Sequence, residues 1–205
     1  MADQARGKVG LILLRNSSFL LHPSFCRGFF GYKKQWRSTG GGRRIQLTTL
    51  MLYFAYGSNM HAAQMMERCP TAKFVCRAKL PSHRLAFTLR SWSRRCGVAD
   101  ILRDETKEVW GVIYELSENE LENLDKDEDF NPARTDDQND YTRENHYVWR
   151  EGDAKRPLLV ALYRGHPQPN PPLPDCEYKN LIVAGAKHWQ LPADYIRELE
   201  SIQTV

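Results

Sequence analysis

The chain is 205 residues long, which is enough for one domain with a tail or for two small domains at most. Its hydrophobic fraction of 41% and charged fraction of 26% are typical of a soluble globular protein. The net charge of +4 is unevenly distributed, because residues 1–50 carry +8 and residues 51–205 carry −4. The larger part is therefore mildly acidic, which argues against a nucleic-acid-binding surface there.

The cysteines and histidines indicate neither a disulfide framework nor a metal site. The five cysteines include no close pair, so we predict free thiols in a reducing compartment. The six histidines are scattered and form no helical pair at i, i+4. We therefore predict no bound metal.

Residues 1–50 differ from the rest in being basic, rich in Ser and Arg and poor in acids. Three interpretations stay open: a disordered or spurious extension upstream of a start at Met51, a mitochondrial transit peptide, or a basic interaction arm. The apolar run Val9–Leu14 is too short to span a membrane, and Gly40–Gly42 is typical of a flexible linker. We predict an extension over residues 1–50 and a folded domain over 51–205.

The domain begins with an apolar strand, Met51–Tyr56, followed at once by the turn residues Gly57, Ser58 and Asn59. A helix over His61–Cys69 follows. A strand that leads through a tight turn into a helix leaves several backbone N–H groups without partners near one point. Such a cluster of N–H groups attracts anions. A plain connection without a ligand remains the alternative.

Four short strands are predicted next: Phe74–Cys76, Leu85–Leu89, Gly97–Leu102 and Val109–Tyr114, the last in the middle of the sheet. Arg90–Arg95 mixes three arginines with Trp92. Such a segment is either a solvated turn or a platform on which bases stack.

A capping box at Ser117–Glu120 begins the next helix. Leu121, Leu124 and Glu128 follow at i, i+3 and i+7, which places Glu128 at the end of the apolar stripe. Partial desolvation there would raise the pKa of its carboxyl group toward the range of a general base. The alternative is a frayed helix end with Glu128 in solvent.

The rest of the chain begins with an irregular polar loop from Asp129 to Asp140. A hairpin of Tyr141–Trp149 and Pro157–Tyr163 comes next, and then a proline-rich connection over His166–Asp175.

Two helices close the chain. The first, Glu177–Trp189, is capped by Asp175, and the second, Ala193–Ile202, has Pro192 in its first turn. Tyr178 lies either in a cleft or in the core, and Gly185 would allow close packing.

Several of these segments together resemble the γ-glutamylcyclotransferase family. The matching motifs cover about Met51–Ile202 and are Tyr53-Phe-Ala-Tyr-Gly-Ser-Asn59, Glu108-Val-Trp-Gly-Val, Leu124-Asp-x-x-Glu128, the Tyr141-Thr-Arg run, Tyr178-Lys-x-Leu-Ile-x-x-Gly-Ala-Lys187 and Leu191-Pro-x-x-Tyr195. The Tyr-Gly-Ser-Asn loop with the Gly-Ala-Lys helix resembles the branch that acts on γ-glutamyl amino acids and dipeptides. The segment Asp129–Asp140 is longer and more acidic than the family's usual link, which bears on the substrate.

The resemblance implies an α+β fold, a small mixed β-barrel with flanking helices. It implies cyclisation of a small-molecule γ-glutamyl substrate to 5-oxoproline with release of an amino acid, without metal or cofactor, with Glu128 as general acid and base. The substrate-binding residues it implies are Tyr53, Phe54, Ala55, Tyr56, Gly57, Ser58, Asn59, Tyr141, Tyr163 and Tyr178.

Several alternatives and expectations accompany this interpretation. A non-catalytic relative that binds a small anion stays open, as does a cyclotransferase of the γ-glutamylamine or glutathione branch. We expect no nucleic-acid or membrane partner and leave a homodimer open. The expected location is cytoplasmic, or mitochondrial if residues 1–50 are a transit peptide.

Overall fold

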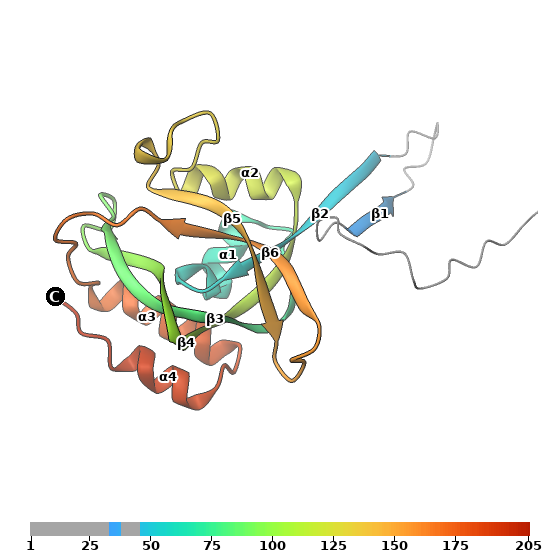
Figure 1. Cartoon of the computed structure of the whole chain (residues 1–205). Helices are drawn as coiled ribbons and strands as arrows, with labels where there is room; N and C mark the ends of the chain where they lie inside the picture. The colour runs from blue at the N-terminus through green and yellow to red at the C-terminus, as the bar shows by residue number, and fades with distance from the viewer. Residues whose placement is uncertain (1–32, 38–45) are drawn as a thin grey trace, which may run out of the picture.

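The computed structural model describes residues 33–37 and 46–205 (Figure 1). The elements, in chain order, are β1 (Lys33–Arg37), β2 (Gln46–Ala55), η1 (Ser58–Met60), α1 (Ala62–Arg68), β3 (Lys73–Arg90), β4 (Gly97–Ser117), α2 (Glu118–Asp127), η2 (Asp136–Gln138), β5 (Tyr141–Arg150), β6 (Pro157–Gly165), α3 (Cys176–His188) and α4 (Ala193–Glu200). Both η elements are single 3₁₀ turns. The predictions made for residues 1–32 and 38–45, including Val9–Leu14 and Gly40–Gly42, lie outside the described residues.

The strands form one sheet in the order β1-β2-β4-β3-β5-β6. Neighbours in this order are antiparallel, whereas β6 returns to pair with β2 in parallel at Tyr53 and Ala161. This last pairing closes β2 to β6 into a mixed five-stranded barrel, so the predicted α+β barrel is confirmed. Val109–Tyr114 lies in β4 between β2 and β3, which confirms its predicted central place.

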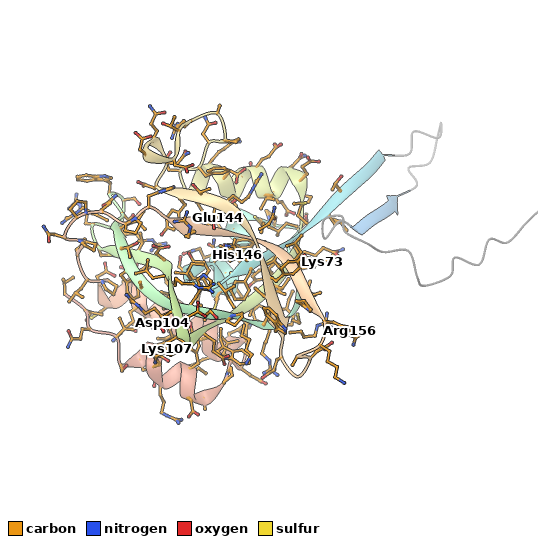
Figure 2. All side chains as sticks on the ribbon, viewed as in Figure 1. Lys73, Asp104, Lys107, Glu144, His146 and Arg156 are labelled. Atoms are coloured by element: carbon orange, nitrogen blue, oxygen red, sulfur yellow. The ribbon has the colours of Figure 1, made fainter. Side chains whose placement is uncertain are left out.

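Helices flank the barrel on opposite sides. Figure 1 shows α2 on one side and the pair α3 and α4 on the other. Charged side chains surround the ribbon, among them Lys73 and Arg156, as Figure 2 shows. On β5, His146 Nε2 lies 2.9 Å from Glu144 Oε2.

The four short strands predicted between Phe74 and Tyr114 are wrong as separate elements. They merge into the two long strands β3 and β4, which pair along almost their whole length. The pairing register shifts between Pro81 and His83, where Ser82 adopts φ 57°. Residues 104–107 of β4 have no partner on β3 at this irregularity, so this largely exposed polar stretch lies within a strand although it resembles a loop.

The predicted start of the first strand is also corrected. β2 begins at Gln46 rather than Met51, because residues 46–50 pair with β1. It ends at Ala55, so Tyr56 already belongs to the connection that follows.

The helix ends follow the predicted capping chemistry with one exception. The capping box of Ser117 and Glu120 is present, and Asp175 Oδ1 accepts a hydrogen bond from Tyr178 N at 2.7 Å. Pro192 occupies the N-cap of α4 rather than its first turn.

The packing of α3 positions the connection after β2. A Cβ atom added to Gly185 would lie 2.6 Å from the backbone of Met60, so no larger side chain fits there. This confirms the predicted close packing. The connection between β2 and α1 is therefore fixed against α3, which is also the helix that carries Tyr178.

Candidate active site

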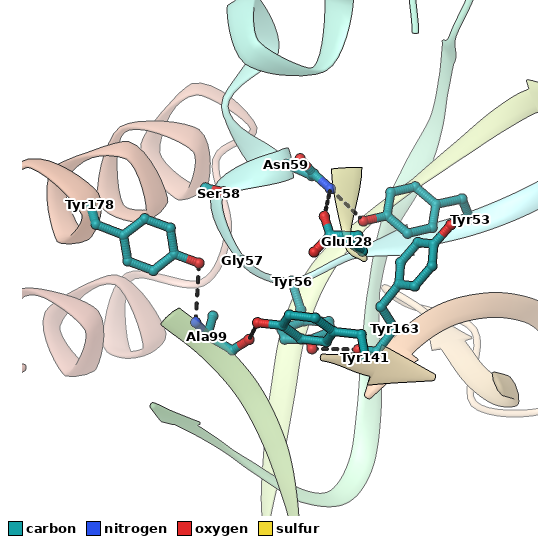
Figure 3. Close-up of a pocket in the computed structure, with 10 residues that line it drawn as sticks. All are labelled: Tyr53, Tyr56, Gly57, Ser58, Asn59, Ala99, Glu128, Tyr141, Tyr163 and Tyr178. Atoms are coloured by element: carbon teal, nitrogen blue, oxygen red, sulfur yellow. Dashed lines mark hydrogen bonds between the residues drawn. The ribbon is translucent and has the colours of Figure 1, made fainter. Parts of the chain in front are cut away.

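A cavity opens where β2 ends, between the connection to α1, the barrel strands and α3 (Figure 3). Its volume is about 30 Å³. Five of its lining side chains are tyrosines, each brought from a different place in the sequence. The lining residues are Tyr53, Tyr56, Gly57, Ser58, Asn59, Ala99, Glu128, Tyr141, Tyr163 and Tyr178.

The segment Gly57–Asn59, here called the glycine loop, forms one wall. A Cβ atom on Gly57 would lie 3.1 Å from Ala99 Cβ and 3.7 Å from the Tyr178 hydroxyl, so a side chain would crowd the cavity. Within residues 46–205, the backbone N–H groups of Gly57 and Ser58 donate no hydrogen bond. They are available to an anionic group of a ligand, as the strand–turn–helix pattern predicted.

Glu128 follows α2 directly and turns its carboxylate toward the glycine loop (Figure 3). Its Oε1 accepts hydrogen bonds from Asn59 Nδ2 at 3.1 Å and from Arg68 Nη1 at 3.0 Å. The side chain is 18% exposed. Burial raises the pKa of this carboxyl group, and the charge of Arg68 and the hydrogen bond from Asn59 partly oppose the increase.

Asn59 links the glycine loop to the carboxylate. The same Nδ2 that reaches Glu128 also donates to the Tyr53 hydroxyl at 2.8 Å. Its Oδ1 accepts from Gln64 Nε2 and from Arg68 Nη1, both at 3.0 Å. The amide orientation of Asn59 is thus set by two side chains of α1.

The tyrosines are held by backbone and carboxylate partners. Ala99 forms hydrogen bonds with two of the hydroxyl groups. Its carbonyl accepts one from the Tyr141 hydroxyl at 2.6 Å, and its N–H donates one to the Tyr178 hydroxyl at 3.1 Å. The Tyr56 hydroxyl donates to the carbonyl of Tyr163 at 2.5 Å, and the Tyr163 hydroxyl donates to Asp125 Oδ1 at 2.8 Å.

Burial raises the pKa of all five tyrosine hydroxyls above the ordinary value, so they stay protonated at physiological pH. The cavity therefore offers neutral hydroxyl groups around a single carboxylate.

Comparison with known proteins assigns the chain to a family. Residues 108–199 match the model of the AIG2-like family. The human protein gamma-glutamylcyclotransferase is 31% identical over 160 residues, which cover 74% of this chain and 78% of the human one. The chain belongs to the γ-glutamylcyclotransferase family. The mouse gamma-glutamylcyclotransferase is similar to the same extent, with 31% identity over 160 residues.

A solved structure of a gamma-glutamyl cyclotransferase supports the same assignment. It superimposes with a TM-score of 0.69 at 28% identity, and the match covers 76% of this chain and 89% of the other. The fold expected from the resemblance is thereby confirmed as that of the γ-glutamylcyclotransferase family. The chain is accordingly an enzyme of this family.

The structure brings together nine of the eleven site residues expected from the resemblance. The exceptions are Phe54 and Ala55, whose side chains are fully buried in the core and do not line the cavity. Side chains alternate along a strand, so Phe54 points away from Tyr53, and its ring packs on Gly111. Ala55 carries only a methyl group, which stays within the core.

Sequence analysis missed Ala99, Gln64 and Arg68 in this γ-glutamylcyclotransferase site. Ala99 contributes only its backbone N–H and carbonyl groups, and such a role does not require a particular residue type. For Arg68 a signal existed, because a helix that directly follows the glycine loop must carry some of its side chains beside that loop. No cluster of three or more metal-ligating side chains occurs among residues 33–37 and 46–205. Across the same residues, no helix is long and apolar enough to cross a membrane.

Proposed function

We propose that the chain is a γ-glutamylcyclotransferase that acts on γ-glutamyl amino acids and dipeptides. The substrate's α-amine attacks its own γ-carbonyl carbon, the new C–N bond closes a five-membered ring, and the amide C–N bond to the leaving amino acid breaks. The products are 5-oxoproline and a free amino acid. The observation that carries this proposal is the mostly buried Glu128 carboxylate in the cavity, hydrogen-bonded to Asn59 of the glycine loop.

Glu128 is assigned as the group that moves the proton. The α-amine enters as an ammonium group with a pKa of about 8 and cannot attack until it loses a proton. An ordinary Glu has a pKa of about 4.3 and is a weak base, so the increase produced by burial favours the transfer. The protonated Glu128 then gives its proton to the departing nitrogen.

The other cavity residues are assigned to holding the substrate in its bent conformation. Nucleophile and electrophile belong to one molecule, so much of the catalysis consists of keeping them close and aligned. The free N–H groups of Gly57 and Ser58 suit the substrate's carboxylate or the oxyanion that develops on the γ-carbonyl. Tyr141, Tyr163 and Tyr178 line the rest of the space.

A substrate panel tests this proposal. The full chain is incubated with γ-glutamyl-alanine, a γ-glutamylamine and glutathione, and 5-oxoproline is measured. We expect release from γ-glutamyl-alanine. Release only from one of the other two substrates would place the enzyme in another branch. No release from any of them would support a relative that binds a small anion without turnover.

The pH dependence of kcat/KM should report on Glu128. Activity requires the unprotonated carboxylate, so kcat/KM should fall as the pH drops through the raised pKa of Glu128, above the range of an ordinary glutamate. Arg68 lowers this pKa, and its replacement by Met should therefore shift the acidic limb to higher pH. An Arg68→Lys variant keeps the charge and should shift it less. An acidic limb that does not move in a folded Arg68→Met variant would contradict the assignment.

We also propose that residues 51–205 form the catalytic unit and that residues 1–50 are a separate extension. Of the pairs that join β2 to β4, only that of Leu50 and Ser117 lies before residue 51. A protein that begins at Met51 should therefore retain kcat/KM within about twofold of the full chain. A large loss would show that some of residues 1–50 belong to the catalytic unit.

The compartment and assembly of the enzyme are further parts of the proposal. The described cysteines, Cys69, Cys76, Cys96 and Cys176, are free thiols, which suits a reducing cytoplasm. Fusion of residues 1–50 to a fluorescent protein distinguishes this location from a mitochondrial one. Light scattering of the purified chain tests the homodimer.

A further inference from the structure

A second, outer cavity adjoins the active site on the solvent side of Glu128. Its volume is about 330 Å³, and it shares Ser58, Glu128, Tyr141 and Tyr178 with the inner cavity. Its remaining walls come from the turn after β3, residues 91–94, and from the acidic segment around residues 127–140. If the inner cavity holds the glutamyl part, as proposed above, the departing amino acid must extend into this outer cavity.

Arg94 presents a guanidinium group to the outer cavity. Its Nη2 donates to Gln64 Oε1 at 2.9 Å, and its Cζ lies 5.0 Å from the centre of the Tyr178 ring. These two contacts hold the side chain against the glycine loop, because Gln64 also donates to Ser58 Oγ at 2.9 Å. Arg94 is therefore ordered at the boundary between the two cavities.

The charge of Arg94 has no acidic partner in residues 46–205, whereas the other arginine of the outer cavity is paired. Arg68 lies 3.0 Å from Glu128 and 3.5 Å from Asp127. Asp129, which also lines this cavity, is paired with Arg134 at 2.9 Å. Among the described residues, Arg94 is thus the guanidinium in this cavity that can take a carboxylate from a ligand.

Two further features define the kind of ligand that fits. Trp92 lines the cavity with a side chain that is 82% exposed, which offers an apolar face to a ligand side chain. Asp129 and Asp140 also line the cavity and would repel a carboxylate, so a carboxylate is favoured at Arg94. A leaving amino acid with its α-carboxylate at Arg94 and its side chain toward Trp92 satisfies both conditions.

We infer that Arg94 binds the α-carboxylate of the amino acid that the reaction releases and so determines specificity for γ-glutamyl amino acids over γ-glutamylamines. This inference rests on the proposed function. It also gives a role to the Arg-rich turn, which Sequence analysis interpreted as either a solvated turn or a base-stacking platform.

The test compares two substrates that differ in this carboxylate. γ-Glutamyl-alanine carries it, whereas γ-glutamyl-ethylamide has a hydrogen in its place and keeps the methyl group, so the two compounds differ only in the carboxylate. For Arg94→Gln we expect kcat/KM to fall about 10- to 100-fold with γ-glutamyl-alanine and less than about threefold with γ-glutamyl-ethylamide. Arg94→Lys keeps the charge and should recover part of the loss.

Arg95→Gln is the matched control, because Arg95 belongs to the same turn, is exposed and does not line the outer cavity. It should leave the ratio of the two kcat/KM values unchanged. An equal loss with both substrates in Arg94→Gln, or no loss, would overturn the inference. So would an Arg95→Gln variant that changes the ratio as much as Arg94→Gln does.

A binding experiment separates this inference from the proposed reaction. Calorimetry is carried out with both compounds on a Glu128→Gln protein and on the same protein with Arg94→Gln added. We expect the added substitution to weaken γ-glutamyl-alanine binding at least tenfold and γ-glutamyl-ethylamide binding little. Equal weakening, no weakening, or no binding of γ-glutamyl-alanine to the Glu128→Gln protein would contradict it. These results do not depend on turnover, so a wild-type chain without 5-oxoproline release would overturn only the proposed reaction.

Discussion

Glu128→Gln is expected to lower 5-oxoproline release from γ-glutamyl-alanine by a factor of about 10² to 10⁴, the usual contribution of a general acid–base group. A glutamine amide cannot take the proton of the α-ammonium group. Its oxygen can still accept the hydrogen bonds that Asn59 and Arg68 now donate to Glu128, so the fold should remain intact. Turnover is measured together with circular dichroism and the thermal midpoint.

Glu122→Gln provides the matched control for this experiment. It makes the same substitution at an exposed position of α2, outside the residues that line the cavity. Its turnover should equal that of the wild type. A folded Glu128→Gln variant that turns over at a comparable rate would refute the role assigned to Glu128.

Asp100→Ala should produce the largest loss of stability among single substitutions near the site. The carboxylate of Asp100 is fully buried and accepts hydrogen bonds from Thr88 Oγ1 at 2.5 Å and from the backbone N–H groups of Ile101 and Gly165, both at 2.7 Å. Alanine leaves these buried donors without a partner, and each costs about 1–3 kcal/mol. We expect the free energy of unfolding to fall by about 3 kcal/mol or more, measured by urea denaturation.

Asp104→Ala is the comparison for this measurement. Asp104 lies on the same strand, and the side-chain hydrogen bonds it accepts come from Thr106, only two residues away. Its replacement should barely move the urea midpoint. The importance assigned to Asp100 would be refuted if both variants unfolded at the same urea concentration.

The expected effect of Asp100 follows from its place between two strands. It lies near the start of β4, and its bond to Gly165 holds the end of β6, the strand that closes the barrel on β2. The preceding residue, Ala99, holds the hydroxyls of Tyr141 and Tyr178. Loss of Asp100 should therefore also reduce turnover in whatever fraction of the protein stays folded.

The local parts of the site could be predicted from the sequence because they depend on short-range rules. The spacing of Leu121, Leu124 and Glu128 placed a carboxylate on the buried side of a helix end, and the residues after β2 identified the glycine loop. The contacts that join these parts depend on the tertiary structure. The bonds from Arg68 to Asn59 and Glu128 connect α1, the glycine loop and the end of α2, and no pattern in one segment reveals them.

The boundaries of the long strands, in contrast, could not be predicted from local sequence patterns. The hydrophobic runs of β3 and β4 were found, but the polar residues between them suggested loops. The polar residues 104–107 form an irregularity within β4 and have no partner on β3, so local polarity does not mark the end of the strand. Phe54 and Ala55 were assigned to the site because they lie within the motif, although strand alternation alone would have directed Phe54 to the core.

The amide nitrogen of Asn59, which bonds to both Tyr53 and Glu128, restricts how a substrate can enter. A flap motion of the glycine loop would have to break both hydrogen bonds and would carry Asn59 away from Glu128. We therefore expect the glycine loop to stay in place beside Glu128 while substrate enters. Exchange of substrate and product should proceed through the outer cavity, between the turn that carries Trp92 and the segment that carries Asp140.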